Sequence, residues 1–492
     1  MNNNSLEFSW PNFRWHVLKD LIGIIILFVL SIFMVYFTSQ NITRLFFLLV
    51  LVLFVVSKKN YFWFAYFFIV AQGPGYFFAD FSGTSLHRLP LYTFLAGMSF
   101  TPLDLFVLLV FLKALIKGRK KKLKLEKPLL LVLTYIVLSV IVSSLFYGTN
   151  VDVLAWNLRW VFCYSVIISF SYLMTKKHEI YRFFLLVFPF VFLIIFSQIY
   201  FVTTGSELIN LLNPGFRGVA LNTVTGELRP IMGGGLIVFF SFIFSVFLLV
   251  DRDYKLSKIY LYVIMAVAFL SIFLSATRLW FVIFSFIFTG YIFVSKKKIW
   301  STLRIVSIFF LIISALIYSG LIPLNLVLQS SWGRVQQVFG IASGGLYSVD
   351  TAANRLINQL PVIMAIIKQN LIIGYGFSYI SRMYYDNDFG FLNTILIFGV
   401  IGLSLFIFFF VKLLIMLALS IKKISIRNPF RISLKIMIIA WIGILIGYFT
   451  TWDFFTWYFD KVFFISILIA LAEFFVMQAD KEELRMKHSV NS

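Results

Sequence analysis

The chain has 492 residues, of which 61% are hydrophobic and 13% charged, and its mean hydropathy is +0.96. A water-soluble protein of this size does not tolerate such a composition, so the sequence predicts one polytopic membrane domain, 1–492, and excludes a set of soluble domains. The net charge of +22 is explained by membrane topology and by contacts with anionic lipid headgroups, so we expect no nucleic-acid partner.

The N-terminal twenty residues lead into a long apolar stretch with no small-residue cleavage site behind it, which predicts a retained first span. Fourteen segments are apolar enough to be helical spans of an all-α protein. They lie near 21–38, 45–57, 61–81, 102–116, 128–148, 154–174, 183–203, 231–250, 259–276, 279–294, 305–322, 389–411, 436–450 and 462–478.

The distribution of Lys and Arg predicts the topology. If the N-terminus is cytoplasmic, 31 of the 42 basic residues fall in cytoplasmic segments, including LKALIKGRKKKLKLEK at 112–127. Every cytoplasmic loop then follows the positive-inside rule. We therefore expect both termini in the cytoplasm.

The basic residues left on the outer side are mostly arginines. They are Arg44, Arg88, Arg159, Arg217, Arg229, Arg278, Arg334, Arg355, Arg382, Lys368 and Lys461. Lysine is sufficient to fix a topology, whereas the planar guanidinium group binds phosphate through two hydrogen bonds. The excess of arginine predicts an anionic, phosphorylated ligand on this side, unless these are ordinary loop charges that reach the headgroups.

Two of these arginines are expected at membrane depth. Arg159 lies about a turn inside its span, and Arg278 lies at a tight hairpin turn. An arginine there costs about 2.5–3.5 kcal/mol on insertion scales, so it is paired or faces a polar cavity. In the outer loop 203–230, Glu227 accompanies Arg217 and Arg229 in a stretch that looks ordered, and Glu227 can also be a purely structural partner of an arginine.

One outer loop, 323–388, is long, and a connection of this length in a compact membrane protein is normally functional. Within it, 352–372 has apolar residues at helical spacing along one face. This predicts an amphipathic interfacial helix that is kinked at Pro361, with Arg355 near its start.

The same loop continues through GYGF at 374–377 and then passes Arg382, Asp386 and Asp388 before the next span. A water-poor environment can raise the pKa of a carboxylate towards neutrality, which suits acid/base catalysis. The alternative is that these polar residues have no catalytic role and only mark the end of the loop before the next helix.

These residues carry a resemblance to the O-antigen polymerase and ligase superfamily. The stretch NRLINQLPVIMAIIKQNLIIGYGFSYISRMYYDNDFGFLNTILIFGVIGLSLFIF resembles its C-terminal signature, which ends in a G-x-x-G pair, here Gly399 and Gly402. GMSFTPLDLFVLLVFL at 97–112 and LSATRLWFV at 274–282 resemble two earlier span starts of the same family. An R-x10-G match from Arg334 to Gly345 is expected about once by chance and is given little weight.

The resemblance implies a glycosyltransferase at the outer membrane surface that uses no metal and no other cofactor. Its donor and acceptor would be oligosaccharides linked to undecaprenyl diphosphate, and a chain-length regulator is a further partner. Arg217 or Arg229 with Arg278 would clamp the diphosphate, and Arg355 would hold the acceptor or the second diphosphate. Family ligases carry a His, considered the base, where this chain has Asp388, and this departure favours a polymerase.

Only one cysteine, Cys163, and four histidines are present, so the sequence predicts neither a disulfide framework nor a Cys-based metal site. The expected location is the bacterial cytoplasmic membrane, with the active site outside. The alternatives are a ligase that transfers finished glycan to lipid A core, a lipid-linked oligosaccharide flippase, or an unrelated membrane glycosyltransferase. A flippase should show two similar halves, and we find no internal repeat.

Overall fold

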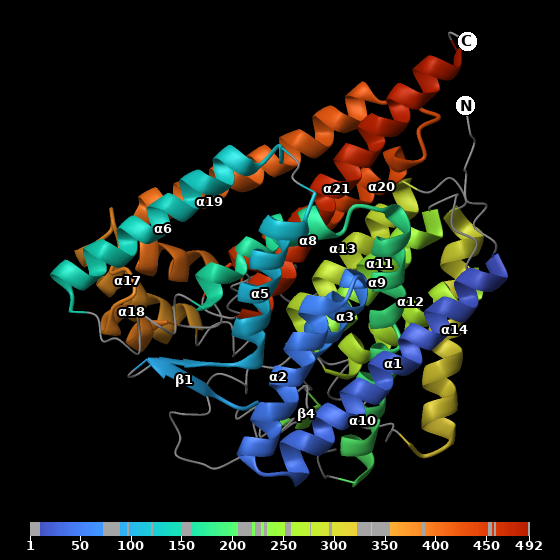
Figure 1. Cartoon of the computed structure of the whole chain (residues 1–492), viewed down its shortest axis with the longest axis horizontal. Coiled ribbons are helices and arrows are strands. Elements are labelled where there is room, and N and C mark those ends of the chain that lie inside the picture. The colour runs from blue at the N-terminus through green and yellow to red at the C-terminus, as the bar shows by residue number, and fades with distance from the viewer. Residues whose placement is uncertain are drawn as a thin grey trace.

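Helices make up nearly all of the described part of the chain (Figure 1). The computed structural model describes residues 10–71, 89–95, 98–119, 122–148, 159–204, 219–221, 228–230, 234–250, 257–275, 277–294, 298–321, 336, 355–385, 389–450, 455–456 and 459–490.

The helices form because a backbone in hydrocarbon must satisfy its hydrogen bonds within its own segment. They are α1 (Trp10–Phe37), α2 (Gln40–Val56), α3 (Asn60–Val70), α5 (Pro102–Lys117), α6 (Glu126–Phe146), α8 (Ser165–Leu173), α9 (Lys177–Val187), α10 (Phe190–Thr204), α11 (Gly235–Val250), α12 (Lys258–Leu274), α13 (Arg278–Val294), α14 (Lys298–Tyr318), α17 (Leu360–Gln369), α18 (Tyr379–Tyr384), α19 (Gly390–Lys423), α20 (Phe430–Thr450) and α21 (Phe459–Val490). A helical stretch from Arg159 precedes α8, and the π-helix η4 (Arg355–Gln359) precedes α17.

A helix occupies the described part of each of the fourteen predicted segments. Within the described residues, six helical stretches are long and apolar enough to cross a membrane, one of them formed by α9 and α10 together, and the remaining apolar stretches are shorter. The six are Trp15–Phe37, Glu126–Phe146, Lys177–Thr204, Gly390–Lys423, Phe430–Phe449 and Phe459–His488. Helices α19 and α21 continue beyond the predicted span ends at 411 and 478. The protein is therefore an all-α protein with apolar helices that suit a membrane.

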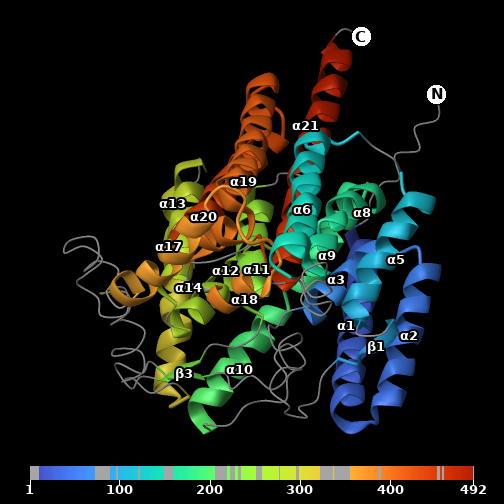
Figure 2. The same ribbon diagram turned by 90° about the vertical axis from the view of Figure 1, so that its left-hand side faces the viewer.

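The apolar part of helix α21 is mostly buried inside the bundle, whereas its C-terminal part from Lys481 onward is largely exposed, and the apolar parts of α1 and α6 are mostly not buried. Beyond the first turn of α6 most exposed side chains are apolar, such as Leu145 and Phe146, as expected for a face in contact with lipid. Helix α6 packs along α19, and the two slant together away from the rest of the bundle (Figures 1 and 2).

The segments that the charge pattern assigns to the cytoplasm meet at one end of the molecule, which we call the inner end. The contacts that join them are Lys59 with Asp20, Lys113 with Ser57, Lys124 with Asp480 and Ser425 with Glu483. The start of α1 and the end of α21 both lie towards this end (Figure 1). The predicted topology requires that these cytoplasmic segments lie together. We call the opposite end of the molecule the outer end.

Two short antiparallel hairpins lie at the outer end. Strand β1 (Tyr92–Leu95) pairs with β2 (Met98–Phe100), and β3 (Val219–Leu221) pairs with β4 (Leu228–Pro230). The second hairpin lies in the outer loop 203–230, most of which, including the residues between the two strands, lies outside the described residues.

Candidate functional site

Helix α19 is broken at Gly399, the first glycine of the G-x-x-G pair. Gly399 has φ 66° and ψ −174°, a conformation that essentially only glycine adopts. The break separates an outer half-helix, 390–398, from an inner part, 400–423. The backbone groups on both sides of the break therefore need partners from elsewhere.

Those partners come from the segment 371–376, which contains the first three residues of the GYGF turn. The hydrogen bonds that join it to α19 are Val400 N to Leu371 O at 2.9 Å, Ile401 N to Ile372 O at 3.3 Å, Tyr375 N to Leu396 O at 2.8 Å and Gly376 N to Ile397 O at 2.7 Å. In an unbroken helix the two α19 amides would donate to the two α19 carbonyls, because these lie four residues apart. Both pairs are instead bonded to the inserted segment.

The glycines of this turn are required by close packing. Gly374 and Gly376 both have positive φ, at 76° and 56°. A Cβ at Gly374 would overlap the backbone of α19, and a Cβ at Gly376 would overlap Ser143 of α6. Ser139, which Gly376 also approaches, is seven residues from the end of α6, or about 10 Å along its axis. We therefore call 371–377 the re-entrant segment.

The helix predicted over 352–372 is present in part, as η4 and α17, and its predicted apolar face is buried only in part, because Ile357 and Leu371 are exposed. The π-helix η4 leads into α17 directly before Pro361, where a kink was expected. Ile363 and Ile367 are buried, whereas Val362 on the other side is exposed. The buried face packs against the outer half of α19, so α17 is anchored to the bundle instead of contacting only the leaflet (Figure 2).

The predicted membrane-depth arginine, Arg159, is paired. Its Nε lies 3.5 Å from Oδ2 of Asp104, and the exposed fractions of the two side chains are 14% and 7%. Asp104 lies in the first turn of α5, where Oδ2 accepts hydrogen bonds from the backbone N–H (2.7 Å) and the hydroxyl (2.9 Å) of Thr101. Thr101 and Asp104 form a capping box, so the start of α5 fixes this carboxylate.

Trp160 connects this pair to the re-entrant segment. Its side chain is buried, and its ring packs edge-on against Phe377 at 5.5 Å and Phe398 at 6.3 Å. Phe377 ends the re-entrant segment and Phe398 ends the outer half of α19. The charge pair and the broken helix therefore belong to one site at the outer end.

Further polar groups surround this site. Asp460 and Lys461, at the start of α21, are both buried, and so is Cys163. The Tyr164 hydroxyl donates to the Phe455 carbonyl at 2.7 Å. Buried charges of both signs thus collect where α5, α8 and α21 meet.

Sequence reasoning missed the partner of Arg159. The TPLD stretch at 101–104 was noted as part of a family-like span start, and a Thr three residues before an Asp is a capping signal. Nothing in the sequence, however, indicates that a carboxylate 55 positions earlier meets Arg159.

The structure places some of the other predicted residues by their backbone. Arg278 is the first residue of α13, Arg229 lies on β4 opposite Ala220, and Arg355 opens η4. Arg382 is half-buried on α18, directly after the re-entrant segment. The remaining candidates, Arg217, Glu227, Arg334 and Asp388, lie outside the described residues.

Arg44, by contrast, has a structural role at the outer end. Its Nε donates to the Leu91 carbonyl at 2.9 Å, and its own carbonyl accepts the Tyr92 hydroxyl at 2.7 Å. Burial raises the pKa of Tyr92, so this hydroxyl remains a donor at neutral pH. Arg44 therefore joins the start of α2 to β1.

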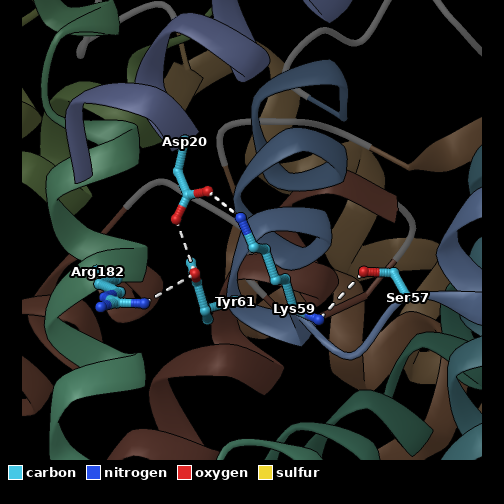
Figure 3. A network of polar contacts seen from close by, with 5 residues as sticks. All are labelled: Asp20, Ser57, Lys59, Tyr61 and Arg182. Carbon is cyan, nitrogen blue, oxygen red and sulfur yellow. Dashed lines mark hydrogen bonds and ion pairs between the residues drawn. The ribbon is translucent and has the colours of Figure 1, made fainter. Parts of the chain in front are cut away.

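A second polar network lies at the inner end (Figure 3). Asp20 of α1 accepts Lys59 Nζ at 2.6 Å on one oxygen and the Tyr61 hydroxyl at 2.7 Å on the other. Arg182 of α9 donates to the Tyr61 hydroxyl at 3.0 Å. Three helices that are distant in the sequence are joined here.

Within the ranges described, no group of three or more His, Cys, Asp and Glu side chains is placed to hold a metal ion. No protein-family model matches the chain, and no curated protein matches it by sequence.

Proposed function

We propose that the protein polymerises oligosaccharide repeat units linked to undecaprenyl diphosphate into O-antigen, capsular or exopolysaccharide. In this proposal it is a metal-independent glycosyltransferase of the bacterial cytoplasmic membrane that acts at the outer face. The observation that carries the proposal is the buried Arg159–Asp104 pair beside the re-entrant segment at the outer end. A guanidinium group held at membrane depth suits a diphosphate that enters from the outer leaflet.

The proposed reaction forms one glycosidic bond and breaks one bond to phosphate. A hydroxyl of the incoming repeat unit attacks the anomeric carbon of the growing chain, and its proton passes to Asp388. The bond to the diphosphate breaks, and the polyprenyl diphosphate leaves with the electron pair. Arg278, with Arg217 or Arg229, stabilises the departing charge, and Arg355 holds the second substrate.

A flippase remains a second candidate, because broken helices are common in transporters. In those proteins the freed backbone groups at the break bind the substrate or the ion. In α19 the four groups at the break are bonded to the re-entrant segment of the same chain. This arrangement favours a fixed outer structure over a transport site.

The test compares cells with and without the gene, by a gel of surface glycan and by extraction of lipid-linked intermediates. A polymerase predicts that the ladder collapses to a single repeat unit that still reaches the surface. Full-length polymer that persists on its carrier would instead indicate a ligase. Single units trapped on the cytoplasmic side would indicate a flippase and would refute the proposal.

A further inference from the structure

The ends of two helices that are distant in the sequence meet beside the re-entrant segment. Tyr147 directly follows the last residue of α6, and Asn370 directly follows the last residue of α17. The Asn370 amide nitrogen donates to the Tyr147 hydroxyl at 2.5 Å, and the centroids of the Tyr147 and Tyr375 rings are 5.1 Å apart. Side chains therefore join the ends of α6 and α17 to each other and to the re-entrant segment.

A second partner fixes the orientation of the Asn370 amide group. The same nitrogen donates to the carbonyl oxygen of Gly374, which can only accept a hydrogen bond. The other end of the amide group is therefore the oxygen, Oδ1, and no described residue donates to it. Because Asn370 is half-buried, this oxygen is an acceptor that a ligand can reach.

Two neighbouring side chains have donors that no described residue uses. The half-buried Tyr147 hydroxyl accepts from Asn370, but its own proton has no acceptor in the described part of the chain. Gln369 is exposed at the end of α17, and only its amide oxygen has a contact there, 3.4 Å from the Tyr375 hydroxyl. We call Tyr147, Gln369 and Asn370 the α6–α17 cluster. It offers a hydroxyl donor, an amide donor and an amide acceptor.

This combination of groups discriminates between classes of ligand. The oxygens of a diphosphate only accept hydrogen bonds, so a site for a diphosphate presents donors and positive charge. A sugar hydroxyl both donates and accepts, so a site for a sugar needs groups of both kinds. The three side chains of the cluster are neutral, and the apolar ring of Tyr147 suits the mixed polar and apolar surface of a sugar. The cluster therefore suits a glycan better than a diphosphate.

The cluster lies beside the candidate site at the outer end. Tyr375, which contacts Tyr147, belongs to the re-entrant segment, and Phe377 of the same segment packs against Trp160. Phe146, directly before Tyr147, is apolar and exposed, as expected for a residue in contact with lipid. A tyrosine at the end of such a helix lies where the hydrocarbon meets the headgroups. The first sugars of a lipid-linked glycan lie at the same level.

We propose that Tyr147, Gln369 and Asn370 form a binding site for the glycan of the lipid-linked repeat unit, separate from the arginines proposed for its diphosphate. The inference rests on the proposed function, because it takes the ligand to be the glycan of that substrate. The Asn370 amide oxygen accepts from one sugar hydroxyl. The Tyr147 hydroxyl and the Gln369 amide nitrogen donate to neighbouring sugar oxygens.

Two probes that cannot react test this site on the purified full-length protein in detergent micelles. One is the free glycan, released by mild acid from the lipid-linked intermediates of cells that lack the gene, and the other is undecaprenyl diphosphate. Tyr147→Phe removes the hydroxyl and keeps the ring, whereas Gln369→Ala removes the exposed amide. We expect each substitution to weaken binding of the glycan about threefold to tenfold and to leave binding of undecaprenyl diphosphate unchanged.

Matched controls remove the same groups elsewhere at the outer end. Tyr200→Phe, near the end of α10, and Gln40→Ala, at the start of α2, should leave both affinities unchanged. The melting temperature of each variant is measured in parallel, because Tyr147→Phe also removes an acceptor of the Asn370 amide. Gln369→Ala changes an exposed side chain, so it tests the site even if Tyr147→Phe does not fold.

The outcomes separate the two proposals. If the wild-type protein does not bind undecaprenyl diphosphate, the proposed function fails. If it binds undecaprenyl diphosphate but not the glycan, or if the variants change both affinities equally or neither, the function stands and the glycan site is wrong. Phosphatidylglycerol is added as a competitor, because the exposed Lys368 precedes the cluster on α17. Displacement of the glycan would show a site for a phospholipid headgroup and would also overturn the inference.

Discussion

The two ends of the molecule use buried carboxylates in different ways. At the inner end both oxygens of Asp20 are bonded, one to Lys59 and one to Tyr61 (Figure 3). At the outer end, Oδ2 of Asp104 contacts both Thr101 and Arg159, whereas Oδ1 has no hydrogen-bond partner in the described structure. Saturated networks of this kind join helices, whereas incompletely bonded ones are more typical of functional sites.

The backbone shows the same contrast. At the inner end Lys113 donates to the carbonyls of Phe54 and Ser57 and so completes the end of α2. At the outer end a whole segment is inserted into α19, and its carbonyls and amides replace the helix's own bonds. We therefore expect inner-end substitutions to change stability and outer-end substitutions to change activity, except where they break the insertion.

The largest effect is expected for Gly399→Ala, because the new Cβ would overlap the Ile372 carbonyl and displace the re-entrant segment. Each buried backbone group left without a partner costs about 1–3 kcal/mol, so the loss should reach several kcal/mol. The measurement is the melting temperature and folded yield of the detergent-purified protein. Gly320→Ala is the control, since Gly320 also has a positive φ, 72°, but a Cβ added there would meet no described atom within 4 Å. Equal destabilisation of both variants would contradict the docking explanation.

Arg278→Lys should remove most of the activity, by more than about tenfold, because lysine keeps the charge but loses the bidentate contact with phosphate. Polymer formation from lipid-linked repeat units is the measurement, normalised to the amount of inserted protein. Arg44→Lys is the matched control, since Arg44 is an outer arginine already bonded to the Leu91 carbonyl. Wild-type activity of Arg278→Lys would refute the clamp.

At the inner end, Tyr61→Phe removes the hydroxyl that links Asp20 to Arg182. We expect the free energy of unfolding to fall by about 1–3 kcal/mol, with unchanged activity per folded molecule. Thermal unfolding and the polymerisation assay are run on the same preparation, and Lys58→Ala, at an exposed position, is the control. Lost activity at unchanged stability would show that this end takes part in the reaction.

The smallest effect is expected for Lys124→Ala. Lys124 pairs with Asp480 at 2.7 Å, but both side chains are about 40% exposed. Exposed pairs contribute about 0–1 kcal/mol and are screened by salt. The shift in melting temperature should be small and should vanish at high salt; a large shift that persists in salt would indicate a further role at this end.

The positions of the helices could be predicted from the sequence because lipid imposes long apolar stretches. The segment near 128–148 matches α6 closely, whereas α1 begins eleven residues before the predicted start at 21. The end of α21 could not be predicted in this way, since this helix continues into polar sequence after residue 478, and α19 continues as a helix twelve residues past the predicted end at 411. The distribution of Lys and Arg divided the loops into a cytoplasmic set and an outer set. In the structure, segments of the cytoplasmic set meet at the inner end.

The candidate site was predictable only in its parts. The glycines at 374, 376 and 399 were recognised as a pattern, but their purpose depends on hydrogen bonds between separate segments. The pairing of Arg159 with Asp104 depends in the same way on the packing of helices that hydropathy does not describe. Interactions between distant residues need the folded arrangement, whereas helix positions follow from local composition.

The insertion at Gly399 also has a consequence for how the chain folds. Because the re-entrant segment and α19 are adjacent in the sequence, they can pair as a hairpin with little loop-closure entropy, before the last two helices are complete. Once formed, the bonds from Tyr375 and Gly376 to Leu396 and Ile397 lie among buried residues, so these two amide protons should be among the slowest to exchange in the protein. The segment from 371 to 401 would then act as an early, persistent folding unit, around which the outer end is assembled.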